Sequence, residues 1–190
     1  VTADSAYVTA HDMFRSVNDR YADITLLEDA VYRRSNSLLF PNKVFRVPKG
    51  SNFWVSYDAV VIPDMTIRSG PDRFVLKDFW YNWREYDFRS LLHPQGPKVQ
   101  ALLADIGPYA EFYGIEGLTS GPAALWVRAK GPLFAPNMVL GAEIERPTIL
   151  NKFQGRSLRA SATVTDCVVR LDPVVFSTSK GSAKLRGRID

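Results

Sequence analysis

The feature that most constrains this chain is the density of aromatic residues between positions 74 and 92. Within ten positions of this stretch lie six aromatic side chains, Phe79, Trp80, Tyr81, Trp83, Tyr86 and Phe88. An aromatic ring buries roughly 150 to 250 Å² and dominates the energetics of the core or interface that contains it. We therefore expect this stretch to anchor either the fold or a contact with a partner.

Two geometries are compatible with the stretch. A helix that begins after Asp78 and ends before Pro94 places Phe79, Trp83 and Tyr86 on one stripe. A strand sends alternate rings to opposite faces, and aromatic enrichment is typical of strands. The length and the Asp and Pro boundaries favour the helix.

Both geometries direct the rings to two sides, so one hydrophobic face does not cover them all. Some of the six aromatic residues must therefore pack on a neighbouring element or on a partner. A core cluster and a protein interface both remain open as roles for them, because Trp and Tyr are also enriched in interface hot spots.

The composition is that of an ordinary globular protein. With 190 residues, 46% of them hydrophobic and 23% charged, the chain suits one domain spanning 1–190. No apolar run reaches the roughly 18 residues that a membrane-spanning helix needs, so no membrane span is expected. The chain begins at Val1, and the sequence does not indicate whether this is a processed N-terminus. We expect a soluble protein or part of a large assembly such as a virion, and the sequence indicates no compartment.

Few residues are available for catalysis or metal binding. The lone Cys167 excludes an intrachain disulfide, and its strand-like surroundings indicate a buried thiol. The two histidines, His11 and His93, have no partner at metal-ligand spacing. Phosphate-binding and serine-nucleophile motifs are missing from the sequence. The sequence therefore predicts no catalytic residues, no metal and no cofactor, and favours a non-enzymatic protein.

Hydrophobic periodicity divides the chain into segments of different structure. A helical N-terminal pair is predicted for 1–35, strands for 38–76, helices for 78–107 and strands again for 123–190. The segment 107–122 is rich in glycine and proline and predicts a long loop.

Two of these helices carry specific signals. Thr25 and Glu28 form a capping box in the N-terminal segment. Pro97 begins a pattern in which apolar residues recur at helical spacing: Val99, Leu102, Leu103 and Ile106. Together the segments predict an α+β, β-rich fold: an antiparallel sheet system, sandwich or barrel-like, with an N-terminal helical pair and one or two central helices.

Turn signals predict three hairpins. The first joins strands 44–47 and 53–60 around Pro48-Lys49-Gly50. The second joins strands 65–68 and 73–76 through a Gly-Pro turn, and the third joins 174–178 to 183–189 at the end of the chain. A change in the alternation near Thr165 and Asp166 predicts a β-bulge there.

The basic character of the chain is concentrated in its last fifth. The formal net charge is +4, and residues 150–190 hold eight basic and three acidic residues. We take six of these cations as candidates for binding an anionic partner: Arg156, Arg159, Lys180, Lys184, Arg186 and Arg188. The last three alternate with apolar residues along one strand, which also protects a sheet edge from aggregation.

The sequence favours a structural or assembly component of a virion, phage tail or secretion-type complex that acts through protein–protein interfaces. Its partners would be other protein subunits in a homo-oligomer. One alternative is a module that uses the basic C-terminal strand to bind nucleic acid or another acidic surface. Another is a hydrolase or small-ligand-binding domain whose pocket is roofed by the 107–122 loop.

Overall fold

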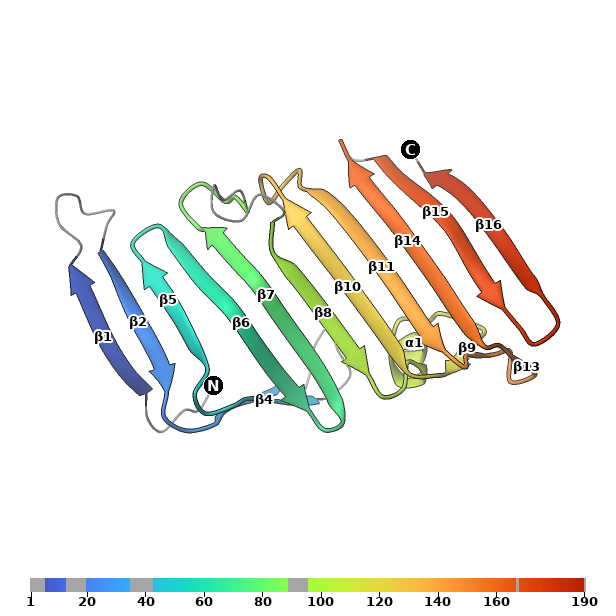
Figure 1. The fold of residues 1–190 in the computed structure, drawn as a ribbon, viewed down its shortest axis with the longest axis horizontal. Helices are drawn as coiled ribbons and strands as arrows, with labels where there is room; N and C mark the ends of the chain where they lie inside the picture. Colours follow the sequence, from blue (N-terminus) through green and yellow to red (C-terminus); the bar gives the residue numbers. More distant parts are fainter. Residues whose placement is uncertain (1–5, 13–19, 35–42, 89–95, 167, 190) are drawn as a thin grey trace.

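The protein is built on one open, single-layered antiparallel sheet, which Figure 1 shows face-on. The computed structural model describes residues 6–12, 20–34, 43–88, 96–166 and 168–189. Within them the main path of the sheet runs β1-β2-β5-β6-β7-β8-β10-β11-β14-β15-β16, and β3 and β4 join it beside β6. These strands are β1 (Ala6–Asp12), β2 (Arg20–Leu26), β3 (Ala30–Arg34), β4 (Lys43–Val47), β5 (Asn52–Ser56), β6 (Ala59–Ser69), β7 (Asp72–Asn82), β8 (Lys98–Leu103), β10 (Ala123–Lys130), β11 (Asn137–Glu145), β14 (Ser157–Thr165), β15 (Val168–Ser177) and β16 (Ser182–Ile189).

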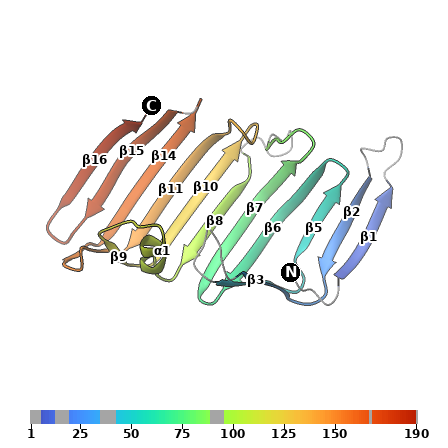
Figure 2. The same cartoon turned by 180° about the vertical axis from the view of Figure 1, so that it is seen from behind.

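A small cap lies against one margin of this sheet. It consists of the short helix α1 (Gly107–Phe112) and a three-stranded sheet of β9 (Leu118–Ser120), β12 (Thr148–Ile149) and β13 (Phe153–Gln154). Figure 2 shows α1 and β9 in front of the main sheet, together with β3. The expected sandwich or barrel is therefore wrong for the described part of the chain, because the main path ends at β1 and β16, which do not pair.

The β-rich prediction is confirmed where neighbouring strands follow one another in sequence. β6 and β7 form the predicted hairpin, with Ser69 opposite Asp72 across the Gly-Pro turn. β15 and β16 form the predicted C-terminal hairpin, in which Ser177 pairs with Ser182. Each of these hairpins needs only local pairing, which the alternation of residues and the turn residues encode.

The N-terminal helical pair predicted for 1–35 is wrong, because the described residues of this segment form β1, β2 and β3. Thr25, the expected helix cap, lies in β2 opposite Asn52 of β5, and the Asn52 side-chain amide donates to its hydroxyl at 3.2 Å. Pairing with distant strands therefore overrides the local helix signal.

The helices predicted for 78–107 are also wrong. β7 continues through Phe79 and Tyr81 to Asn82, and the residues after Pro97 form the strand β8 (Lys98–Leu103). Val99 and Leu103 mislead because positions four apart share a face in a strand as well as in a helix. In the structure they share a face with Ala101, which lies directly opposite Phe74 of β7.

Three smaller expectations are corrected as well. The strands on either side of Pro48-Lys49-Gly50 do not form a hairpin, because β4 pairs with β3 and β6 whereas β5 pairs with β2 and β6. The segment 107–122, predicted as a loop, contains α1 and β9. Asp166 lies at the turn between β14 and β15 with a φ of 52°, so the change in alternation there comes from a hairpin turn and not from a bulge. The register irregularity of β15 lies further along, between Leu171 and Val174.

The buried core is small and lies under the cap. Phe74, Leu103, Ala123 and Ile144 of the main sheet pack there with Ile106 and Tyr109. Phe45 of β4 adds a ring that meets Phe74 edge-on, with 5.5 Å between ring centroids. Away from this margin, most described positions of β10, β11, β14 and β15 are half-buried or exposed.

Candidate functional site

The two faces of the main sheet differ sharply in chemistry. Residues directly opposite each other in an antiparallel ladder lie on the same face, so the register assigns every position to one of the two. One face, which we call the apolar face, carries almost only aliphatic residues from β8 to β16: Val99, Ala101, Leu103, Ala123, Leu125, Val127, Met138, Leu140, Ala142, Ile144, Leu158, Ala160, Ala162, Val164, Val169, Leu171, Val174 and Leu185.

A shallow trough crosses the strands on the apolar face. One cross-strand row consists of Ala101, Leu125, Ala142 and Ala160, so three of its four members are alanines. This row lies between the residues under the cap and a row of mostly larger side chains, which are Val99, Val127, Leu140, Ala162 and Leu171. The small side chains leave an open trough of about 390 Å³ between them.

The trough contains almost no polar atoms. Of its lining residues, only Trp126 and Ser161 carry a polar side-chain atom, and the register assigns both to the opposite face. The Ser161 hydroxyl donates to the Asp172 carboxylate at 3.0 Å. A molecule lying in the trough would therefore meet hydrocarbon, and the sheet would offer it no side-chain hydrogen bond.

The cap is held on the sheet by a buried carboxylate. Asp72 is only 3% exposed and lies at the start of β7. It accepts hydrogen bonds from the Ala104 backbone N–H at 2.9 Å and from the Tyr109 hydroxyl of α1 at 2.7 Å. These bonds satisfy the polar groups where the cap meets the sheet, so the covered margin stays apolar toward the trough.

The Tyr109 hydroxyl is held in its neutral form. Burial, followed by the hydrogen bond to Asp72 and the charge of that residue, raises the pKa of Tyr109 well above its usual value. Because the folded-state pKa lies above the unfolded one, this contribution to stability is complete below about pH 10 and falls as the pH rises further.

We therefore expect the stability advantage of the wild type over Tyr109→Phe to shrink above about pH 10. The phenylalanine variant has no hydroxyl to ionise, so it does not share this alkaline loss. Urea denaturation of both proteins at neutral and at alkaline pH measures the difference in unfolding free energy. A difference that stays constant with pH would contradict the assignment.

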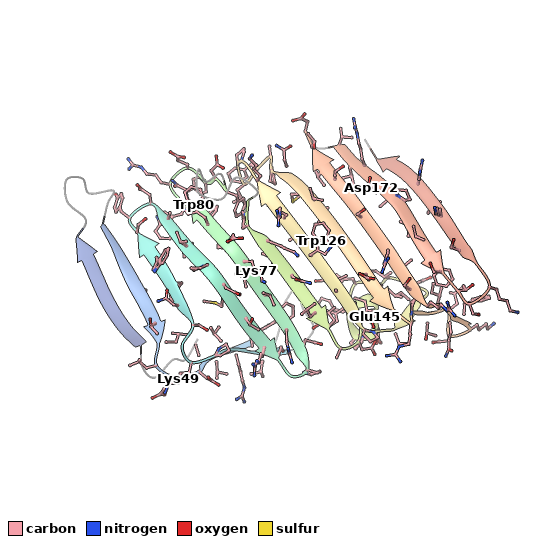
Figure 3. All side chains as sticks on the ribbon, viewed as in Figure 1. Lys49, Lys77, Trp80, Trp126, Glu145 and Asp172 are labelled. Atoms are coloured by element: carbon pink, nitrogen blue, oxygen red, sulfur yellow. The ribbon has the colours of Figure 1, made fainter. Side chains whose placement is uncertain are left out.

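The opposite face, which we call the polar face, carries charges of both signs. Lys77, Trp126 and Glu145, all labelled in Figure 3, belong to it by register. The Lys98 ammonium lies 5.7 Å from the centroid of the Trp126 ring, within cation–π range. The Arg159 guanidinium forms an ion pair with Glu143 on the adjacent strand, with 2.6 Å between Nη2 and Oε1.

The Trp126 ring lies directly over Gly141 on the neighbouring strand β11. A Cβ atom at position 141 would fall 2.3 to 2.4 Å from three ring atoms of Trp126. Glycine is therefore required here by the close approach of the ring. The indole also shields the backbone that the missing side chain leaves open.

We expect Gly141→Ala to lower the free energy of unfolding by about 1–3 kcal/mol, because the methyl group displaces the indole ring. The same substitution in a Trp126→Ala background should have a much smaller effect. A double-mutant cycle measured by chemical denaturation tests the pair. Equal losses in both backgrounds would show that the ring does not set the constraint.

The six aromatic residues predicted as an interface do not form one cluster in the structure. Five of them take part in three separate contacts, and the sixth, Trp80, is placed by its strand pairing. Phe88 meets Phe79 and Tyr81, with ring centroids 6.4 and 5.0 Å away. Trp83 donates from Nε1 to the Tyr57 carbonyl at 2.6 Å. Tyr86, which is half exposed, lies 5.9 Å from Phe134. Trp80 lies opposite Val61 in the register of β6 and β7.

The six predicted anion-binding cations are spread over the last three strands and their turns. Arg159 is paired with Glu143, as described above, and Arg156 precedes β14. Lys180 lies in the turn between β15 and β16. Lys184 and Arg186 are exposed on β16, and position 188 lies directly opposite Arg170.

Two larger cavities near the cap have more polar linings than the trough. One, of about 490 Å³, is lined by α1 and the following turn, including Glu111 and Glu116. The other, of about 520 Å³, includes Asp105 and Arg146. The Asp105 carboxylate accepts from the backbone N–H groups of Gly107 and Gly121 at 3.0 and 2.9 Å, so it braces the loop.

The residues that the structure describes contain no group of three or more His, Cys, Asp or Glu side chains that could hold a metal ion. His93 and Cys167 lie outside the described residues. Across the same described ranges, no helix is both long and apolar enough to cross a membrane.

Fold and site together define a protein whose principal feature is a single-layered amphipathic sheet with an open apolar face. Comparison of the chain with protein-family models, with curated proteins and with solved structures finds no match. The sequence alone does not predict the trough. The alternation Leu158, Ala160, Ala162 shows that β14 has small residues on one face, but these residues form a site only beside Ala142 of β11.

Proposed function

We propose that this protein binds the alkyl chains of lipids in the apolar trough. The observation that carries the proposal is the row of alanines Ala101, Ala142 and Ala160, which makes a depression in an otherwise continuous aliphatic face. Its volume of about 390 Å³ falls within the range of small-molecule pockets. Apolar surface left in water is unfavourable by about 25 cal/mol per Å², so this face favours an apolar occupant.

The chemistry of the trough favours an alkyl chain over a folded protein surface. Protein interfaces carry about one hydrogen bond per 100–200 Å², and their cores are enriched in aromatic residues, Met and Arg. The trough offers aliphatic side chains with hardly a polar atom among them. An alkyl chain needs no hydrogen bonds, and one continuous chain can fill the depression. A partner protein would need several separate side chains to fill it.

The cap gives the trough one closed side. α1 and its neighbours cover the margin that contains Phe74 and Ile144, and the other side of the trough stays open to solvent. This arrangement suits a chain that lies along the row and across the strands. The polar head of the lipid would then remain in water.

A second candidate function is the assembly role expected from the sequence, in which another subunit covers the apolar face. The observation that favours it is the extent of this face, which continues past the trough to the exposed Leu185 of the last strand. In this case the protein would be a homo-oligomer, and the trough would be filled by side chains of the partner.

One experiment separates the two functions. The purified protein is titrated with a long-chain fatty acid that carries a fluorophore at its methyl end, and then with a diacyl phospholipid as competitor. Size-exclusion chromatography with light scattering is run on the same samples. Saturable binding by a monomer is the expected result.

Two outcomes would overturn the lipid proposal. One is an oligomer without saturable binding that Leu140→Asp dissociates, which would assign the apolar face to a subunit interface. The other is a monomer that binds neither probe. If the phospholipid displaces the labelled fatty acid, the site accepts diacyl lipids. If it does not, the site is specific for single-chain fatty acids.

A further inference from the structure

The last strand of the main sheet has an unpaired edge. Each of its neighbours on the main path, from β2 to β15, has a strand on both sides, whereas β16 pairs only with β15 among the described residues. Its pairing with β15 extends from Ser182 to Ile189. One side of β16 therefore presents a row of backbone N–H and C=O groups that another strand can pair with.

β16 lacks two of the features by which proteins commonly block such an edge. It contains no proline, and the register irregularity between β15 and β16 lies between Leu171 and Val174 of β15. Two of its three charged residues, Lys184 and Arg186, flank Leu185 and so belong to the polar face. They leave the apolar face at this edge without a charge that points inward.

The apolar side of β16 is incompletely covered. Leu185 lies opposite Val174 on the apolar face and is 65% exposed. It is the outermost member of a face that continues inward through Leu171. A neighbouring strand with an aliphatic residue beside Leu185 would extend this face and remove the leucine from water.

The cations on the polar side of β16 form no ion pair within the described residues. Asp172 of β15 lies in the irregular stretch opposite Arg186, where its carboxylate accepts a hydrogen bond from the Ser161 hydroxyl. Further into the sheet, Arg159 of β14 is neutralised by Glu143 of β11 at 2.6 Å. Lys184 occupies the same cross-strand row, opposite Val175, and is exposed. In the described part of the chain no acidic side chain pairs with Lys184 or Arg186. An acidic residue on an added strand would meet each of these cations across the ladder.

We propose that β16 is a docking edge for an extended protein segment that adds to the sheet as a further strand. The segment alternates aliphatic residues, which join the apolar face beside Leu185, with Asp or Glu residues, which meet Lys184 and Arg186. Main-chain hydrogen bonds supply the affinity, and the alternating side chains supply the specificity. This inference does not depend on what occupies the trough, because β16 lies beyond the row of alanines.

A nucleic acid fits the same edge less well. Phosphates would meet the cations, but they would leave Leu185 exposed and the backbone groups of the edge without their ladder. A peptide strand pairs with the backbone edge, covers Leu185 and meets the cations at the same time.

The test uses fluorescent peptides of alternating valine and glutamate and, as a matched control, of alternating valine and lysine. Binding to the whole protein is followed by fluorescence anisotropy. The acidic peptide is expected to bind at least about tenfold more tightly than the basic one. N-methylation of alternate amides in the acidic peptide should abolish binding, because these amides can no longer donate to the edge.

A charge-reversed protein completes the test. The exposed pair Lys184→Glu and Arg186→Glu should reverse the preference between the two peptides, with the circular dichroism spectrum unchanged. Equal binding of the N-methylated peptide would overturn strand addition. So would the absence of binding by either peptide, or displacement of the acidic peptide by a single-stranded oligonucleotide at lower concentration.

Discussion

Replacement of Ala160 by tryptophan is expected to abolish alkyl-chain binding while the fold is retained. Ala160 lies opposite Ala142 in the trough and is half-buried. An indole at this position would occupy the depression between the two strands. Because the apolar face is open, the ring can lie on it without displacing a packed core, so we expect little loss of stability.

The expected loss of affinity is at least about tenfold, which corresponds to about 1.4 kcal/mol of binding free energy. The measurement is titration of the variant with the fluorescent fatty acid. Thr163→Trp is the matched control, because it adds the same ring to the same strand on the polar face. Equal affinities of the two variants would remove the trough as the binding site.

Replacement of Asp72 by alanine should produce the largest loss of stability among the changes considered, about 2–4 kcal/mol in the free energy of unfolding. The carboxylate is 3% exposed and accepts from both the Ala104 N–H and the Tyr109 hydroxyl. Its removal leaves these two donors without this acceptor at the margin of the core. We expect the cap to separate from the sheet before the main sheet unfolds.

Chemical denaturation measures the overall loss, and hydrogen exchange of the α1 amides reports the separation of the cap. Asp72→Asn retains an acceptor oxygen and should lose less stability. Asp64→Ala removes an exposed carboxylate of the neighbouring strand β6 and should change stability by less than about 0.5 kcal/mol. If Asp72→Ala were as stable as Asp64→Ala, the proposed role of the carboxylate would be rejected.

The strands of the main sheet from β10 onwards were predictable because they follow one another in sequence order across the sheet. The hairpin of β15 and β16 could be derived from alternation and turn residues. The pairing of the first five strands was not predictable in this way. β2 pairs with β5 across a gap that contains β3 and β4, and no local signal in the segment of Thr25 indicates that pairing.

The candidate site was predictable only in part. Alternation placed Leu185 on one side of the last strand and Lys184 and Arg186 on the other, which is the polarity that the register of β16 shows. The trough depends on Ala101, Ala142 and Ala160, which come from three different strands and meet in one row. A row that crosses strands is created by register, which a short stretch of sequence does not specify.

The sequence by itself determined that the second half of this chain alternates between aliphatic and polar residues, and therefore that its strands have two chemically different faces. Alternation is a local property, since successive side chains of a strand point to opposite sides. The tertiary structure decided that these strands form one layer, that α1 covers only one margin, and that three alanines from different strands meet in one row. These outcomes rest on contacts between residues far apart in the chain, whose energies no local pattern records.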